Sequence, residues 1–344
     1  DSPQGEYGIV DANIVDCFGS GYCNYGCPYG KKLSALDTTL PRAQREFGPD
    51  AVQIYSECMV QRVRPHTSNG SGPTGSTIEC RLGDGRRLEV IAKTVVIAAG
   101  ALGSSLVLQR SGLGGDRVGK GLGFNMGAPM TGEFPERLDA YDGLQISHYL
   151  RPPGDEGLIV EAWFNPGGAQ SLFMPGWFGE HFENMRRYPY MASAGSVVGT
   201  RPNATVRPGF RGRGMKLSYV PHPDDLKRLV SGLELIGRIY LAAGAKRVMP
   251  PTFSFMAIDR EADLTRISTA VRDNSDITIH SSHPQGGNAL SRDPRKGVVD
   301  ETFALHGQRG VYVCDASVFP APITVNPQLT VMALADYASQ TISA

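Results

Sequence analysis

The 344-residue sequence lacks three features that would assign it to a broad class of proteins. It has no net charge, because 34 Lys and Arg balance 34 Asp and Glu, so no overall field draws it to nucleic acid or to an anionic membrane. It has no run of about 18 apolar residues, as a membrane span requires, and no targeting segment is visible at its start. We therefore expect a soluble protein of two layered domains that acts on small molecules, since a domain averages roughly 150 residues.

Cysteine is scarce and unevenly placed. Three of the six cysteines, Cys17, Cys23 and Cys27, lie in the segment DCFGSGYCNYGCPYG. Only the Cys23/Cys27 spacing fits half of a structural zinc site, and no second pair of Cys or His ligands follows nearby. We therefore expect no metal. The spacings fit no dense disulfide framework either, so the redox compartment stays open.

Apolar patterning predicts the secondary structure of the first half of the chain. Alternating β-branched residues around the turn GDG predict strands and hairpins from about 51 to 99. The segment TVVIAAGALGSSLVLQRSGLG, residues 94–114, is typical of a buried strand, a tight turn at Gly100 and a helix. Short alternating runs among many Gly and Pro residues between about 130 and 221 predict antiparallel strands.

The second half contains two predicted helices and a strand. Residues 223–245 carry apolar side chains at helical spacing after a candidate aspartate cap, and the helix should end at Gly244. The segment RGVYVCDASVFP predicts a buried strand that stops at Asp315. The helix of NPQLTVMALADYASQTI should have Pro327 in or near its first turn.

Three features could carry chemistry. Asp315 follows a buried strand, where an acid can accept hydrogen bonds from sugar or ribityl hydroxyls, or simply cap a turn. Asn326 begins a helix whose free N–H groups would stabilise negative charge, although an N-cap is the commoner meaning. His283, in SSHPQGGNAL, is a candidate base, because histidine has an unperturbed pKa of about 6.5 and the glycines after it allow close backbone approach to a ligand. A lone histidine is more often structural.

Together these segments resemble the glucose–methanol–choline (GMC) oxidoreductases, flavoenzymes that oxidise alcohols. The matching residues are HPQGGN and GVVDETFALHGQRGVYVCDASVFPAPITVNPQLTVMALADYAS. Upstream, CNYGCPYGKKLSALDTTLPRA is similar to the Cys-rich segment of bacterial and long-chain alcohol oxidase relatives. The NP dipeptide is similar to that of the cholesterol-oxidase-like branch. The resemblance spans nearly the whole chain and is weakest between about 130 and 215.

The resemblance implies FAD as cofactor, with hydride transfer from an alcohol to flavin N5. It makes His283 the catalytic base and Asn326 the second catalytic residue. It also implies FAD contacts at a set of residues along the chain: Val60, Gly100, Asp315, Ala316, Pro327 and Gln328. The expected fold is mixed α/β, with part of a Rossmann-like flavin domain in 1–129, an antiparallel-sheet substrate domain in 130–270, and a return to the flavin domain in 271–344.

One departure from the family pattern concerns the start of the chain. The family begins with a strand, a Gly-x-Gly-x-x-Gly turn and a helix, whereas Gly19, Gly21 and Gly26 have the wrong spacing and follow no apolar strand. The chain also has no initiator methionine. We therefore expect the carboxyl-terminal portion of a family member, with an amino-terminal FAD-binding chain or fragment as its partner.

Alternatives to alcohol oxidation remain at this point. The family includes flavin-containing hydroxynitrile lyases, which the same histidine would serve, and a non-catalytic fragment or subunit is a further alternative. The middle of the chain supplies apolar side chains that either line a pocket for a sterol, long-chain or aromatic alcohol or form ordinary core: Trp163, Phe164, Phe173, Met174, Trp177, Phe178 and Phe182. A sugar substrate is also open, as are the electron acceptor and the oligomeric state.

Overall fold

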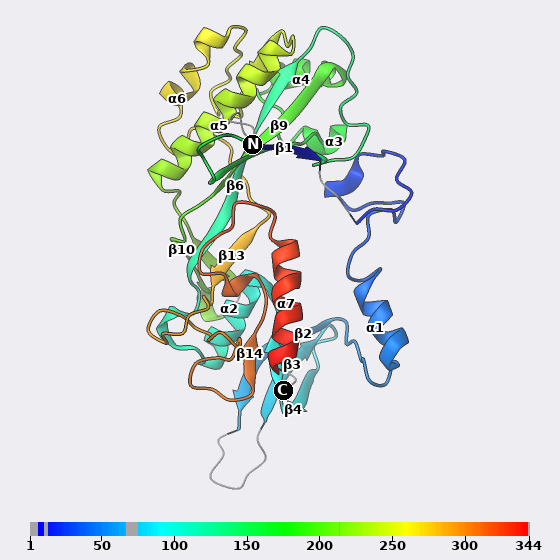
Figure 1. The fold of residues 1–344 in the computed structure, drawn as a ribbon, viewed down its shortest axis with the longest axis vertical. Coiled ribbons are helices and arrows are strands. Elements are labelled where there is room, and N and C mark those ends of the chain that lie inside the picture. The colour runs from blue at the N-terminus through cyan, green and yellow to red at the C-terminus, as the bar shows by residue number, and fades with distance from the viewer. Residues whose placement is uncertain (1–5, 10–12, 67–74, 213, 343–344) are drawn as a thin grey trace. The chain divides into compact units, whose positions relative to one another are not determined.

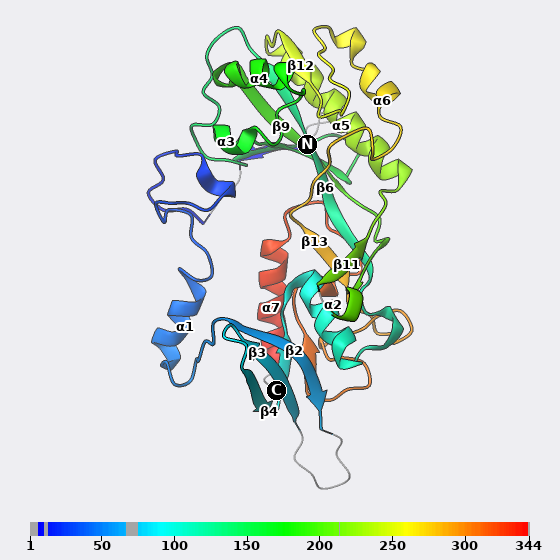
Figure 2. The same cartoon turned by 180° about the vertical axis from the view of Figure 1, so that it is seen from behind.

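The computed structural model describes residues 6–9, 13–66, 75–212 and 214–342. The chain divides into two compact units, each built from three stretches of sequence. Unit 1 comprises Asp1–Ile54, Met126–Val198 and His222–His280, and unit 2 comprises Tyr55–Asn125, Gly199–Pro221 and Ser281–Ala344. Figures 1 and 2 show the elements of both units.

Unit 1 is an antiparallel sheet with helices. Its strands run in the order β1-β7-β8-β9-β6, and β12 pairs with β6. The strands are β1 (Glu6–Ile9), β7 (His148–Arg151), β8 (Leu158–Ala162), β9 (Met191–Gly199), β12 (Arg247–Met249) and the second half of β6 (Lys120–Glu133). The helices are α1 (Thr39–Phe47), α3 (Gly167–Gln170), α4 (Gly179–Arg186), α5 (Pro223–Ala242) and α6 (Arg266–Ala270).

The core of unit 1 lies between α5 and one face of this sheet (Figure 1). Leu229, Leu233 and Ile236 of α5 are buried together with Leu158 and Val160 of β8. Alternation along β8 leaves the other face of the sheet to different side chains. The helix predicted over residues 223–245 is confirmed as α5.

The amino-terminal cap of α5 differs from the prediction. The Nδ1 atom of His222 accepts a hydrogen bond from the N–H of Asp224 at 3.2 Å, so His222 takes the N-cap position that we expected an aspartate to fill. Asp224 and Asp225 lie inside the first turn, where negative charge is favourable to the helix dipole. At the other end, α5 stops at Ala242, and Gly244 has a φ of +95°.

Unit 2 combines three small sheets with two helices. A parallel pair joins β5 (Val95–Ile97) and β14 (Val311–Val313). Figure 2 shows the antiparallel sheet of the hairpin strands β2, β3 and β4. The hairpin strands are β2 (Cys58–Pro65), β3 (Ser76–Leu82) and β4 (Arg87–Ala92). The remaining elements are β10 (Ala204–Pro208), β11 (Met215–Ser218), β13 (Pro284–Gly287), α2 (Gly100–Ser111), the 3₁₀ turn η6 (Ala316–Val318) and α7 (Gln328–Ile342).

The predicted strand, turn and helix after residue 94 form β5 and α2, and the predicted strand before Asp315 forms β14. The first half of β6 pairs with β10 and β13 in unit 2. The core of this unit includes Ile97, Leu108, Val311 and Val313. The predicted antiparallel strands of the middle segment are also present, as β7 to β11.

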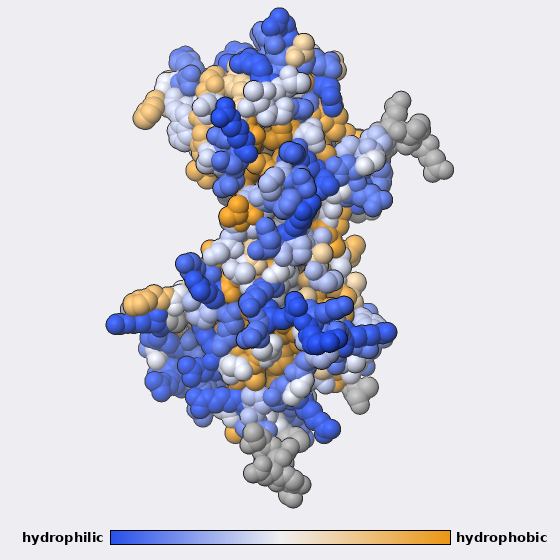
Figure 3. All heavy atoms as spheres, turned by 90° about the vertical axis from the view of Figure 1, so that its left-hand side faces the viewer, coloured by the Kyte–Doolittle hydropathy of each residue, from blue (hydrophilic) through white to orange (hydrophobic). Residues whose placement is uncertain are grey.

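Polar side chains cover much of the face shown in Figure 3, with smaller apolar areas between them. Within the described residues, no helix has both the length and the apolar composition needed to cross a membrane. All six cysteines are free thiols. In the described part of the chain, His, Cys, Asp and Glu side chains form no group of three that could hold a metal ion.

Candidate active site

The carboxyl ends of the parallel strands β5 and β14 lie side by side in unit 2. The strand register pairs Val313 with Ile97, and the N–H of Cys314 bonds to the carbonyl of Ile97 at 3.1 Å. Residues that follow the two strands therefore meet at one edge. These residues are Asp315 after β14 and Gly100 after β5, two of the predicted cofactor-binding residues.

The Asp315 carboxylate fixes this edge by capping two helical segments. Its Oδ2 atom accepts hydrogen bonds from the N–H of Gly100 at 2.9 Å and from the hydroxyl of Ser104 at 2.5 Å. Its Oδ1 atom accepts a bond from the N–H of Ser317 at 2.8 Å. Asp315 is buried. Of the two roles open for Asp315 in the sequence, the cap is therefore present in the structure, and a ligand contact remains a prediction.

His283 lies directly before β13 in unit 2. Its side chain is half-buried, and burial lowers the pKa of His283 below its ordinary value of 6.5. No described side chain hydrogen-bonds to its imidazole. The ring is therefore mainly neutral at pH 7 and has a nitrogen lone pair free to accept a proton.

The glycines after His283 allow close packing within the protein, and their expected role in the approach to a ligand remains a prediction. Gly286 and Gly287 have φ values of +78° and +106°. A Cβ atom at Gly286 would lie 2.5 Å from the carbonyl oxygen of Gly121, and one at Gly287 would lie 2.8 Å from the hydroxyl of Ser105. Glycine is needed because β13 packs closely on β6 and α2.

Two buried amides connect the segment of His283 to the segment of Asn326. The Nε2 atom of Gln285 donates to Oδ1 of Asn125 at 3.2 Å, and its Oε1 atom accepts from the N–H of Ile323 at 3.0 Å. The Nδ2 atom of Asn125 donates to the carbonyl of Val325 at 2.8 Å. Neither Gln285 nor Asn125 was identified from the sequence, because a buried amide has no characteristic spacing.

Asn326 stands at the start of the last helix. Its side chain is exposed, as is that of Gln328, while Pro327 is half-buried. The carbonyl of Pro327 accepts a bond from the N–H of Val331 at 2.9 Å, so Pro327 lies directly before Gln328, the first residue of α7, near the first turn as predicted. The N–H groups of the first turn have no partner within the helix.

Val60 and Ala316 are the remaining predicted cofactor-binding residues. Val60 is half-buried on β2, an edge strand whose pairing with β3 shifts register between Val60 and Arg62. Ala316 begins η6, directly after Asp315. The structure thus places Val60 in a different sheet from the Gly100 and Asp315 pair, within the same unit.

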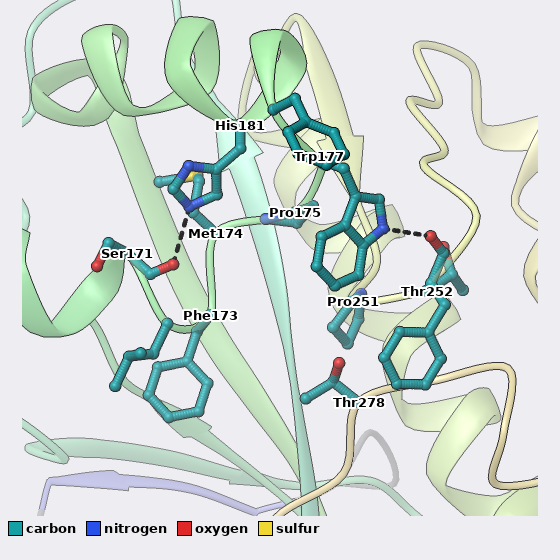
Figure 4. A pocket seen from close by; sticks show the side chains of 13 residues that line it. Ser171, Phe173, Met174, Pro175, Trp177, His181, Pro251, Thr252 and Thr278 are labelled. Carbon is teal, nitrogen blue, oxygen red and sulfur yellow. Dashed lines mark hydrogen bonds between the residues drawn. The ribbon is translucent and has the colours of Figure 1, made fainter.

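Unit 1 contains a separate pocket of about 400 Å³ (Figure 4). Of the predicted aromatic and apolar residues, four line it: Phe173, Met174, Trp177 and Phe178. Phe164 is core, and Phe182 is exposed outside the lining. The rings of Trp163 and Phe173 meet edge to face, with 4.9 Å between their centroids.

The pocket joins two segments that are distant in sequence. One wall is residues 171–178 with His181, and the other is residues 251–253 with Thr278. The indole N–H of Trp177 donates to the carbonyl of Phe253 at 2.7 Å, and the Nε2 atom of His181 lies 2.9 Å from the carbonyl of Ser171 (Figure 4). These bonds fix the walls without any ligand.

Comparison with known proteins agrees with the fold. An amino-terminal and a carboxyl-terminal family model, both described as GMC oxidoreductase, match residues 5–127 and 192–335. The chain is 32% identical over 345 residues to an uncharacterized GMC-type oxidoreductase of Mycobacterium tuberculosis (strain ATCC 25618 / H37Rv), covering 97% of this chain and 52% of the relative. It is 26% identical to a long-chain-alcohol oxidase of Arabidopsis thaliana, covering 95% and 47%.

Solved structures share the fold at low sequence identity. Pyridoxine 4-oxidase from Mesorbium loti has a TM-score of 0.65 at 18% identity and covers 91% of this chain and 62% of its own. A formate oxidase of Aspergillus oryzae, studied for its FAD modification, has a TM-score of 0.61 at 15% identity and covers 83% and 60%. FAD is the cofactor of the GMC family.

The matches bear on the predicted truncation. The amino-terminal model matches residues 5–127, so an absent amino-terminal unit and a partner chain that supplies it are not supported. Gly19, Gly21 and Gly26 themselves lie in a loop with one short 3₁₀ turn. The chain spans about half the length of the curated relatives it matches. On its two family matches and its relatives, the chain belongs to the GMC oxidoreductase family.

Proposed function

We propose that the protein oxidises an alcohol to a carbonyl compound with FAD, and that unit 2 holds the cofactor while unit 1 contributes substrate binding. The observation that carries the proposal is the environment of His283, whose half-buried imidazole has no hydrogen-bond partner among the described side chains and whose pKa burial lowers from 6.5. A general base has to be unprotonated at the working pH and free to bind the proton it removes.

The residues of unit 2 fit FAD. Gly100, at the start of α2, has a φ of +77°, and a Cβ atom there would meet no atom within 4 Å, so space is open in front of its backbone. Ser317 Oγ and Asn288 Nδ2 are buried beside this edge without a hydrogen-bond partner. We propose Gly100, Asp315 and Ala316 for the dinucleotide, Val60 for its adenine through the backbone, and Pro327 and Gln328 for the flavin edge.

The roles of the two catalytic residues follow from their chemistry. His283 accepts the hydroxyl proton of the alcohol on a ring nitrogen, and the Asn326 amide hydrogen-bonds the same oxygen. The chemistry that FAD supplies when bound is acceptance of the hydride from the carbinol carbon. The free N–H groups at the start of α7, near Gln328, stabilise negative charge at that end of the helix. General-base catalysis of this kind contributes about 10²- to 10⁴-fold to the rate.

The test is to mix purified holoenzyme, without oxygen, with primary, secondary, aromatic and sugar alcohols and to follow the absorbance of oxidised FAD. We expect at least one alcohol to bleach the FAD and yield its carbonyl product in equal amount, more slowly when the carbinol carbon carries deuterium. FAD that dithionite reduces but that no alcohol reduces would contradict the proposal.

A further inference from the structure

The pocket of unit 1 is lined mainly by apolar and hydroxyl-bearing side chains, with one histidine, His181. Its thirteen lining residues include no Lys, Arg, Asp or Glu (Figure 4). Its Trp177 N–H is already bonded to the carbonyl of Phe253, and the Thr252 hydroxyl donates to the carbonyl of Ser254 at 2.8 Å. A charged ligand would lose its hydration here without gaining a Lys, Arg, Asp or Glu counter-ion, and the Nε2 atom of His181 already lies 2.9 Å from the carbonyl of Ser171, so the pocket favours an uncharged ligand.

Flat aromatic faces form its walls. The rings of Trp177 and Phe253 lie 6.4 Å apart between centroids, with their planes only 15° from parallel. Trp177 is 57% exposed, Phe253 44% and Phe178 94%. A ligand that covers this exposed apolar surface removes it from water, which favours binding. Aromatic rings stack on such faces with additional favourable energy.

The backbone of the first wall, residues 171–178 with His181, is held in a strained conformation at Phe178. Phe178 has a φ of +47° and a ψ of −114°, outside the regions that a bulky residue adopts without strain. Gly176, with a φ of +99°, precedes it. Strain of this kind persists where the surrounding structure imposes it and is concentrated at ligand sites. In this segment it presents Trp177 and Phe178 outward.

The same wall belongs to a part of the chain that the family models leave unmatched. The two matches end at residue 127 and resume at residue 192, so the wall of residues 171–181 lies between them. Residues 251–253 and Thr278 lie inside the carboxyl-terminal match. The pocket therefore combines a wall from the family-matched region with one that the family models leave unmatched, as expected of a specificity site.

We infer that this pocket is a binding site for an uncharged molecule with a flat apolar ring. The ring would stack on the Trp177 and Phe253 faces, and its shape, rather than charge, would decide which molecules bind. That such a ring is part of the substrate rests on the proposed function. The binding site itself does not.

The test uses acetophenone, an uncharged ring compound with no hydroxyl to oxidise, as the probe. The chain has 2 tryptophans, so the Trp163→Phe variant leaves Trp177 as its only tryptophan, and fluorescence of the holoenzyme then reports the pocket. We expect a saturable change on adding acetophenone. We expect much weaker binding of 2-octanone, which has the same number of carbons without a ring, and of benzoate and benzylammonium, which carry charge.

Two phenylalanine variants in this background locate the effect. Phe253→Ala removes a wall and should weaken acetophenone binding about three- to tenfold, the range of one aromatic stacking contact. Phe182→Ala removes a 63% exposed phenylalanine of α4 outside the lining and should change nothing. Equal effects of the two variants, equal affinity for 2-octanone, or tight binding of a charged compound would overturn the inference. Light scattering that showed two copies of the protein associating through the face of Trp177 would also overturn it, because a second copy would then cover that ring.

The two proposals fail in different ways. If acetophenone binds as expected but no ring-bearing alcohol reduces FAD, the binding site stands and the proposed substrate or reaction is wrong. If alcohols reduce FAD while acetophenone leaves the Trp177 signal unchanged, the oxidation stands and the inference about this pocket is wrong.

Discussion

Gln285 and Asn125 share a buried hydrogen bond of 3.2 Å between Nε2 and Oδ1. The two side chains are 0% and 2% exposed. Gln285 lies two residues after His283, and Asn125 holds the carbonyl of Val325, directly before Asn326. The pair therefore links the two proposed catalytic residues through three hydrogen bonds to fixed backbone and side-chain atoms.

Replacing Gln285 by leucine should disturb the proposed site without touching a catalytic group. Gln285→Leu leaves Oδ1 of Asn125 and the N–H of Ile323 without partners, which should lower the free energy of unfolding by about 2 kcal/mol or more. We expect FAD reduction by substrate to slow about tenfold, because a loosened Asn326 is oriented less well. Gln340→Leu, at an exposed glutamine of α7, is the matched control.

The variant Gln285→Glu shows whether Gln285 positions Asn326 or only stabilises the fold. When protonated, the glutamic acid can donate to Asn125 again, so FAD reduction should recover at low pH relative to Gln285→Leu. Identical pH profiles for the two variants would show that the bond to Asn125 does not position Asn326.

The pH dependence of the reaction should follow His283. Burial lowers the pKa of His283 from 6.5, and the neutral ring is the active base, so kcat/KM should rise with pH and level off with a midpoint below 6.5. His148→Ala, at an exposed histidine of unit 1, should leave this profile unchanged. A midpoint above 6.5 would mean that another group, or a differently placed His283, controls the rate.

The three hydrogen bonds of the Asp315 carboxylate should make a large contribution to the stability of the folded protein. Asp315→Ala leaves the N–H groups of Gly100 and Ser317 and the hydroxyl of Ser104 without their acceptor. We expect the free energy of unfolding to fall by about 3 kcal/mol, measured in denaturant. Asp315→Asn keeps an acceptor and should lie between wild type and alanine. A loss no larger than that of Asp336→Ala, at an exposed aspartate of α7, would contradict this account.

Glu161 should make the protein less stable as pH rises. Burial raises the pKa of Glu161 to about 7 from 4.5. Because the folded state binds this proton more tightly than the unfolded chain, the contribution to stability is complete below pH 4.5 and is lost as pH rises through about 7. The difference corresponds to about 3 kcal/mol.

Denaturant unfolding between pH 5 and 8 measures this effect. Glu161→Gln should remove that part of the pH dependence, whereas Glu156→Gln, at a nearby exposed glutamate, should retain it. Parallel pH curves for wild type and Glu161→Gln would show that the carboxyl of Glu161 ionises normally.

Local pattern was enough to predict most elements that carry the site. The apolar run before Gly100 and the buried strand before Asp315 became β5 and β14, because a continuous apolar run is typical of a strand buried in a parallel pair. The helix that starts directly after Pro327 followed from fixed proline geometry. Resemblance to the family, rather than periodicity, directed attention to His283 and Asn326.

Contacts between distant residues were not predictable. Gln285 and Asn125 are 160 positions apart, and neither has a neighbour in sequence that marks it as buried. The close packing that requires Gly286 involves the carbonyl of Gly121, which sequence spacing does not reveal. The cap of α5 was misjudged because an aspartate near a helix start is the commoner acceptor, whereas the ring of His222 occupies that place.

The most direct measurement of the central claim is the rate of FAD reduction by substrate in a single turnover without oxygen, for wild type, His283→Ala and Asn326→Ala holoenzymes. The absorbance spectrum of bound FAD should be unchanged in all three. His283→Ala should slow reduction by about 10²- to 10⁴-fold, and Asn326→Ala should slow it less. An unchanged rate in His283→Ala, with FAD fully bound, would show that His283 is not the base.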